Sequence, residues 1–256
     1  MIDLLKMWMN QIYRSNQGKV MSEEIEVTKG LNFGLDKLNS ICQEMAENEN
    51  YQPTPEEIEA QEKEIRKHEA KEKQKNLEAS GIGERYFNAS FENYNCNIPE
   101  RKEVLDKLKL FIQDYQEKTL WMVGNSGTGK TMFAAIICRE CLHAHFVKSY
   151  EIELELDDCK SFKASESKKE LLKRYKDYPV LIIDEIGKFE SKDEVKYLFM
   201  IINERYENKK CTVLISNKSK KELVEYLGKP IFDRFTENCM SIEFNFDSYR
   251  INMRSK

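Results

Sequence analysis

The chain has 256 residues, which is enough for one full α/β core and a smaller appendage. Its formal net charge of −4 excludes a protein that coats nucleic acid through bulk electrostatics, so any contact with DNA must be local. No apolar run approaches the roughly 20 residues that cross a bilayer, and the opening MIDLLKMWMNQIYR lacks the basic cluster of a secretory signal. We therefore expect a cytoplasmic protein with no membrane contact.

From Met1 to about Asn50, apolar side chains recur at helical spacing. They are Leu4, Leu5, Trp8 and Ile12, followed by Leu31, Leu35, Leu38, Ile41 and Met45. The pattern predicts a few short amphipathic helices, which we assign to a helical N-terminal domain over residues 1–52. Such a stripe either docks into a partner's groove or forms a small core of its own, and the sequence favours neither.

Residues 53–80 form a strongly charged segment. Thr54 and Glu57 have the spacing of a capping box, and Pro55 occupies the first helical position, so a helix should begin there. Oppositely charged residues follow at i, i+4 spacing, whereas apolar residues are too few for a core face. We interpret the segment as a solvated helical linker that acts as a spacer.

After Ser80, strand and helix segments alternate, which is typical of a parallel sheet with helical crossovers. Strands are predicted at residues 119–123, 144–149, 180–183, 211–216 and 240–244, because most of these runs are rich in β-branched or aromatic residues. Helices are predicted at residues 130–142, 167–175, 192–208, 219–227 and 230–237. The expected fold class is therefore α/β, with a three-layer αβα nucleotide-binding domain over residues 81–256.

The segment GNSGTGKT matches the phosphate-binding pattern GxxxxGK[ST], and it stands between the strand run TLWMV and the helix MFAAIICRE. Its glycines let backbone N–H groups point at the phosphates of ATP, and Lys130 supplies a charge for the β and γ groups. The predicted ATP-binding residues are Gly124, Asn125, Ser126, Gly127, Thr128, Gly129, Lys130, Thr131 and Asp184. The alternative is a chance glycine-rich turn, and the matching flanks argue against it.

The apolar run VLII ends in Asp184 and Glu185, where carboxylates would face the ligand crevice of an open α/β sheet. We predict that Thr131 and Asp184 hold Mg²⁺, and that Glu185 orients and polarises the attacking water. An ordinary acidic turn is the alternative. The following strand run, TVLIS, ends in Asn217, which could reach the γ-phosphate or the water but is also a common turn residue.

The segment CRECLHAH carries Cys138, Cys141, His143 and His145, and it invites a zinc interpretation. The cysteine pair lies on the helix that the phosphate loop begins, on one packing face, and the histidines are too close together for a zinc finger. The chain's seven cysteines are an odd number in a protein too long to need disulfides. We therefore expect free thiols and no zinc site.

Several blocks carry a resemblance to a known family. In chain order they are SGIGERYFNASFENY, GNSGTGKT, LIIDEIG with ESKDEVKYLFMIINERY, SNKS, LGKPIFDRF and FNFDSYR. In their order and spacing they resemble the DnaC-like bacterial helicase loaders and their relatives, the transposition helper ATPases of the IstB type. The resemblance implies an AAA+ fold. The chain stops too soon after Arg250 for a helical lid, as is usual in the loader family.

The resemblance also implies roles for single residues. Arg234 takes the place of the arginine finger, which reaches across a subunit interface to the neighbour's γ-phosphate. Without the resemblance, a surface arginine paired with Asp233 or Glu237 would be the preferred interpretation. Asn217 and Arg250 take the places of the first and second sensors. The predicted catalytic set is Lys130, Glu185, Asn217, Arg234 and Arg250, while Phe91 and Tyr94 either line the adenine or belong to the core.

By resemblance, we expect an ATPase of low turnover that loads a hexameric replicative DNA helicase of the DnaB type. The N-terminal helices would grip the helicase, and the AAA+ domain would form a homo-oligomer through the arginine-finger interface and contact single-stranded DNA. One alternative is an IstB-type transposition helper, which wraps duplex DNA and recruits a transposase. Another is a scaffold that binds nucleotide without hydrolysing it, and the intact Lys130, Thr131, Asp184 and Glu185 argue against it.

Overall fold

The computed structural model describes residues 55–159, 166–235 and 239–249. The predicted N-terminal domain over residues 1–52 and the predicted sensor Arg250 therefore lie outside the described residues. By its contacts the chain divides between Lys71 and Glu72. The unit that begins at Glu72 carries the sheet and all the described candidate site residues.

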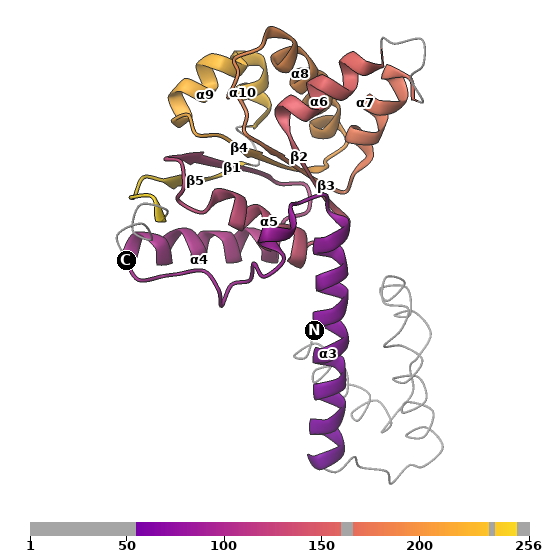
Figure 1. The fold of residues 1–256 in the computed structure, drawn as a ribbon, viewed down its shortest axis with the longest axis vertical. Helices are drawn as coiled ribbons and strands as arrows, with labels where there is room; N and C mark the ends of the chain where they lie inside the picture. Colours follow the sequence, from indigo (N-terminus) through magenta and orange to yellow (C-terminus); the bar gives the residue numbers. More distant parts are fainter. Residues whose placement is uncertain (1–54, 160–165, 236–238, 250–256) are drawn as a thin grey trace, which may run out of the picture. The chain divides into compact units, whose positions relative to one another are not determined.

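Five parallel strands form one sheet in the order β2-β3-β4-β1-β5 (Figure 1). They are β1 (Thr119–Gly124), β2 (Ala144–Lys148), β3 (Val180–Asp184), β4 (Cys211–Ile215) and β5 (Cys239–Phe244). Every residue of β3 and β4 is buried, as expected for a parallel sheet covered on both faces. The predicted strands are confirmed to within a residue or two at their ends. Because β4 lies between β1 and β3, the carboxyl ends of these three strands are neighbours.

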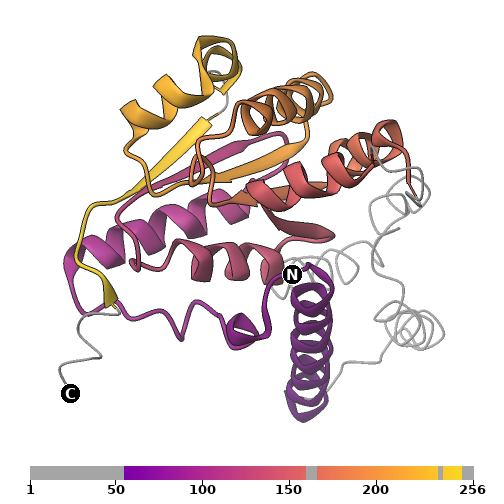
Figure 2. The same cartoon turned by 45° about the horizontal axis from the view of Figure 1, so that its top comes forward.

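Helices cover both faces of the sheet. The helices of the described residues are α3 (Pro55–Ala79), η2 (Glu84–Tyr86), α4 (Pro99–Gln113), α5 (Lys130–Glu140), α6 (Ser149–Asp158), α7 (Lys168–Asp177), α8 (Lys192–Glu207), α9 (Lys220–Leu227) and α10 (Lys229–Phe235). Helices α4 and α5 lie on one face and α6 to α10 on the other (Figure 1, Figure 2). Each face has its own apolar core, because alternate strand residues such as Met122 and Trp121 point to opposite sides. This is the expected three-layer αβα arrangement.

Two α-helices, and the short 3-10 helix η2, lie where no helix range is predicted. Helix α4 begins with Pro99 and buries Val104, Leu108 and Phe111, a spacing that one helical face explains. Helix α6 begins at Ser149, so the predicted strand over residues 144–149 is one residue too long. The strand stops because Ser149 turns into the helix and donates its hydroxyl to the backbone oxygen of Glu185 at 3.1 Å.

Helix α3 is described from Pro55, where the described residues begin, to Ala79, and the predicted cap Thr54 lies outside them. Its last turns are more than a solvated spacer, because Leu77 is fully buried in the core beneath α4 and α5. Lys73 forms a 2.6 Å ion pair with Glu140 at the end of α5. The spacer interpretation is therefore wrong for this end of the segment. None of the helices in the described part of the chain has the length and apolar character of a membrane span.

The two cysteines of the segment CRECLHAH belong to the core, whereas Leu142 and His143 are exposed. Cys138 and Cys141 are fully buried, and burial raises the pKa of the Cys138 thiol to about 12. The ring of His145 stacks on Tyr178 with 4.1 Å between centroids, and burial lowers its pKa to about 4. No cluster of metal-binding side chains occurs among the described residues.

Candidate active site

The phosphate loop spans the end of β1 and the start of α5, and its shape depends on glycine. Gly124, Gly127 and Gly129 have φ values of 115°, 76° and 108°, a region that favours glycine. A β-carbon on Gly124 would lie 2.6 Å from the backbone oxygen of Phe244. A β-carbon on Gly129 would lie 3.1 Å from the ring of Tyr94. The loop can therefore expose its backbone N–H groups only with these residues.

Lys130 is buried inside this loop. Its Nζ donates to the backbone oxygens of Gly124 and Asn125, each at 2.7 Å. Burial lowers its pKa to about 8, against the opposing effect of the Asp184 carboxylate. Burial disfavours the charged form of the Lys130 side chain, and an anion beside it would favour that form again. A phosphate group is such an anion.

Asp184 and Thr131, the predicted magnesium ligands, lie side by side. The Thr131 hydroxyl donates to Asp184 Oδ2 at 2.9 Å, and the backbone N–H of Glu185 donates to Oδ1 at 2.6 Å. Burial raises the pKa of Asp184. A hydroxyl and a buried carboxylate are the hard oxygen donors that Mg²⁺ takes together with phosphate oxygens, so these residues fit the ion.

Glu185 follows β3 in a left-handed backbone conformation, with φ of 60°. Its Oε1 pairs with Lys188 at 2.9 Å. Its Oε2 is buried, and no hydrogen-bond donor among the described residues reaches it. A buried acceptor oxygen without a partner is a costly feature, and bound water would satisfy it. This is the property that a carboxylate which orients a reacting water needs.

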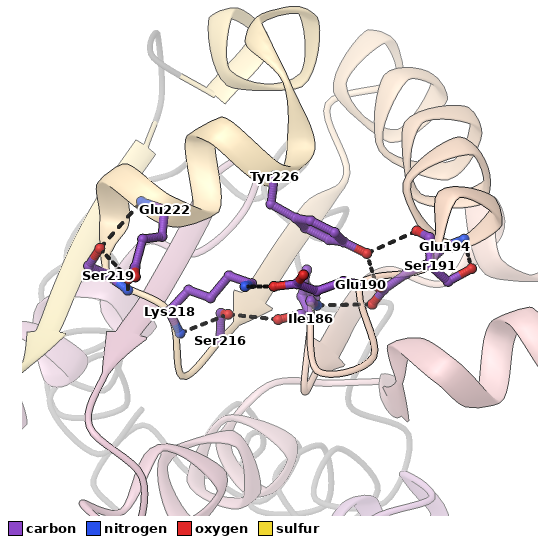
Figure 3. A network of polar contacts seen from close by, with 10 residues as sticks. Ile186, Glu190, Ser191, Glu194, Ser216, Lys218, Ser219, Glu222 and Tyr226 are labelled. Atoms are coloured by element: carbon purple, nitrogen blue, oxygen red, sulfur yellow. Dashed lines mark hydrogen bonds and ion pairs between the residues drawn. The ribbon is translucent and has the colours of Figure 1, made fainter.

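Asn217 is exposed in the loop after β4, between the strands that carry Gly124 and Asp184. The neighbouring Lys218 accepts a hydrogen bond from the Gly124 N–H through its backbone oxygen, at 3.3 Å. On its other side Ser216 donates its hydroxyl to the backbone oxygen of Ile186 at 2.7 Å (Figure 3). The loop of Asn217 is thus joined to both the phosphate loop and the loop after Glu185.

A C-terminal segment, residues 244–249, lies against the phosphate loop. The N–H of Tyr249 donates to the backbone oxygen of Gly127 at 2.9 Å, and the N–H of Asn125 donates to that of Phe244 at 3.0 Å. Arg101 on α4 holds the same segment, because its guanidinium lies over the rings of Phe246 and Tyr249. The predicted sensor Arg250 is the next residue along the chain and lies outside the described residues.

Arg234 is placed differently from the other predicted catalytic residues. Its Nη1 donates to the backbone oxygen of Pro230 at 2.9 Å, and its guanidinium lies 5.6 Å from the ring centroid of Phe199 on α8. Within the described residues, neither of these contacts involves the phosphate loop. The side chains of Asp233 and Glu237, its alternative partners, are not among the described ones.

Of the two predicted adenine-side residues, Tyr94 is a core residue that also supports the phosphate loop. Its ring packs edge-on against Phe133 at 4.6 Å and lies under Gly129. Phe91 is only partly buried at the edge of the same core. Sequence reasoning missed the supporting roles of Arg101, Ser149 and Lys188. Arg101 and Ser149 contact distant backbone oxygens, which no motif marks. Lys188 pairs with Glu185 three residues away, which its spacing could have indicated.

A family model described as IstB-like ATP binding protein matches residues 34–256. The chain belongs to this family. The replicative helicase loader DnaC of Escherichia coli K12 is 30% identical over 200 residues, which cover 75% of this chain and 81% of DnaC. The insertion sequence IS232 putative ATP-binding protein of Bacillus thuringiensis subsp. berliner is 31% identical over 161 residues, which cover 59% of this chain and 62% of that protein.

Solved structures confirm the AAA+ fold of this IstB-like protein. The crystal structure of the DnaC helicase loader matches 64% of this chain and 100% of its own, with a TM-score of 0.56 and 23% identity. The DnaI crystal structure matches 66% of this chain and 94% of its own, with a TM-score of 0.54 and 21% identity. The replication initiator DnaA bound to AMPPCP and single-stranded DNA has a TM-score of 0.53 at 16% identity and matches 65% of this chain and 52% of its own.

The glycine that opens the phosphate loop of this IstB-like protein should not tolerate a side chain. Gly124→Ala should lower the free energy of unfolding by about 1–3 kcal/mol or more, because the new methyl group combines a left-handed backbone with a clash against Phe244. Urea unfolding measures it. Gly83→Ala is the matched control, since it has φ of −65° and no atom within 4 Å of the new methyl group. Equal stability of the two variants would contradict the loop geometry.

Proposed function

We propose that this protein is an ATP-hydrolysing loader of a hexameric replicative DNA helicase. The main support is its 30% identity to a replicative helicase loader across 81% of that protein's length. The described site supports the proposal, because Asp184 is hydrogen-bonded to both Thr131 and the Glu185 N–H, and its carboxylate lies close enough to Lys130 to affect the pKa of that ammonium. These are the residue types that phosphoryl transfer uses. In this proposal the protein acts in the cytoplasm, assembles with copies of itself and contacts single-stranded DNA.

The residues of the site divide the work of hydrolysis. The loop N–H groups and Lys130 hold the phosphates of ATP, and Thr131 and Asp184 would hold Mg²⁺, which neutralises charge on the phosphate oxygens. In this proposal Glu185 lies near the γ-phosphate. Its buried Oε2, which has no partner among the described residues, accepts a hydrogen bond from the attacking water and orients it. Asn217 contacts the γ-phosphate or the same water, and Arg250 and a neighbour's Arg234 complete the charge stabilisation.

A transposition helper is the second candidate, and it shares the ATPase core. It is favoured by the family description and by the likeness to the insertion sequence protein. The two candidates differ in their partners: one binds a helicase and the other a transposase. A non-hydrolysing scaffold is disfavoured, because such a protein has no need for a buried carboxylate oxygen that lacks a partner next to Asp184.

Mass measurement of the full chain mixed with a replicative helicase, with and without ATP, tests the loader proposal. We expect a stable complex with the helicase that ATP changes in composition, and its loss when residues 1–51 are deleted. A complex with a transposase instead would favour the transposition helper. Phosphate release with DNA and Mg²⁺ is the second measurement, with Lys130→Ala as the control. Release no greater than in that control would favour the scaffold.

A further inference from the structure

Three Ser-x-x-Glu sequences begin helices in this chain, and one of them is built differently. Ser167 with Glu170 and Ser219 with Glu222 form full capping boxes, in which the exposed glutamate accepts from the serine N–H. In the third, Ser191 caps α8, but Glu194 is buried at 3% exposure and bonds elsewhere. A buried carboxylate is costly unless it is well bonded, so this departure calls for a physical reason.

Glu194 joins the loop after β3 to helix α9. Its Oε1 accepts the Gly187 N–H at 3.1 Å, and its Oε2 accepts the hydroxyl of Tyr226, which also lies 3.0 Å from the Ser191 backbone oxygen (Figure 3). Burial first, and the Glu194 carboxylate second, raise the pKa of Tyr226, so its hydroxyl keeps its proton and is the donor. The contact is therefore a charge-assisted hydrogen bond in a partly buried setting.

The same loop contacts the loop of Asn217 at several points. Lys218 pairs with Glu190 at 2.6 Å, and Ser216 bonds to the Ile186 backbone oxygen at 2.7 Å (Figure 3). The approach is close, because a β-carbon on Gly187 would lie 2.6 Å from Cε of Lys218 and 3.2 Å from the Tyr226 ring. Gly187 also has φ of 71°. Glu185 immediately precedes this contact region and Asn217 lies within it.

We propose that Glu194 and Tyr226 are positioning residues for ATP hydrolysis, which hold the loops of Glu185 and Asn217 together as one unit. This inference rests on the proposed ATPase function, because the two residues would act on the geometry of that same site. Glu185 has a left-handed backbone, a conformation that glutamate rarely adopts, so contacts that fix the residues after it help to set where its carboxylate points. Tyr226 lies on α9, and α9 is followed directly by α10, which carries Arg234. A movement of α10 would therefore be transmitted to the loops of Glu185 and Asn217 through the hydrogen bond between Tyr226 and Glu194.

Tyr226→Phe is the central test, because it removes the hydroxyl and keeps the ring that packs against Gly187. At a temperature where the variant is folded, we expect kcat for ATP to fall about tenfold to a hundredfold and the ATP dissociation constant to stay within about twofold. Glu194→Gln, which removes the charge, should act in the same direction. The double variant should lose little more than either single variant, since both remove one interaction. If Tyr226→Phe fails to fold, Glu194→Gln carries the test.

Glu222→Gln is the matched control, because it weakens an exposed capping box on the same helix as Tyr226. A role in stability alone predicts that Tyr226→Phe lowers Tm and leaves kcat equal to that of the wild type, which would overturn the proposal. Amide hydrogen exchange gives a readout that needs no turnover: Gly187 and Lys218 should both exchange about tenfold faster in Tyr226→Phe and not in Glu222→Gln. Unchanged exchange at both amides also overturns it. Wild-type protein that releases no phosphate above the Lys130→Ala control contradicts the proposed ATPase instead.

Discussion

Glu185→Gln should bind ATP with unchanged affinity and release phosphate about a hundredfold to ten-thousandfold more slowly than the wild type, because an amide cannot polarise the attacking water. The substitution keeps the size of the side chain, and Gln can still lie beside Lys188. The hydrogen bonds that position Lys130 and Thr131 go to the phosphate-loop backbone and to Asp184 and not to the Glu185 side chain, so ATP binding should survive. Phosphate release under single-turnover conditions and titration with labelled ATP measure the two quantities separately.

The control for this prediction is Glu207→Gln at the exposed end of α8, which makes the same chemical change far along the chain from the motif. It should leave turnover unchanged. A Glu185→Gln protein that hydrolyses ATP at the wild-type rate would show that another group positions the water. A protein that loses binding as well as turnover would show that the Glu185 carboxylate supports the phosphate loop instead.

The parts of the site that the sequence predicted are local ones. GNSGTGKT specifies its own geometry, because three glycines with positive φ and a helix start lie within eight consecutive positions. Asp184 follows four buried apolar residues in one strand, so the sequence of this strand alone places the carboxylate at its carboxyl end. The adjacency of Thr131 and Asp184 then follows from the strand order of a parallel α/β sheet.

The parts that it did not predict depend on contacts between distant segments. SKDE before α8 has the same capping pattern as SKKE before α7 and α9, and nothing in its letters shows that Glu194 turns toward Tyr226. Arg101 donates a hydrogen bond to the backbone oxygen of Asp247 in the C-terminal segment, which lies 146 residues further along the chain. Helix α4 was missed because its lysines and glutamates dilute the apolar face that Leu108 and Phe111 form.

Arg234→Ala should keep ATP affinity and lose assembly-dependent hydrolysis by about a thousandfold or more, the usual effect of removing an arginine that acts on a neighbour's phosphate. Among the described residues its guanidinium contacts the backbone oxygen of Pro230 on α10 and the ring of Phe199 on α8. Arg85→Ala is the matched control, since Arg85 also lies over a ring, at 5.2 Å from the centroid of Tyr86. The rate of ATP turnover with helicase and DNA measures the effect. Normal stimulated turnover of Arg234→Ala would show that Arg234 is not the arginine finger.

A mixing experiment separates a role across the interface from a role within one chain. Lys130→Ala subunits cannot use their own phosphate loop but still offer Arg234, whereas Arg234→Ala subunits have an intact loop and no finger. If the arginine acts on the neighbour, the two inactive proteins together should recover a clear fraction of wild-type turnover, because mixed interfaces pair one good loop with one good arginine. If Arg234 serves only its own chain, each variant lacks an essential part of the same site, and the mixture should be no more active than its components.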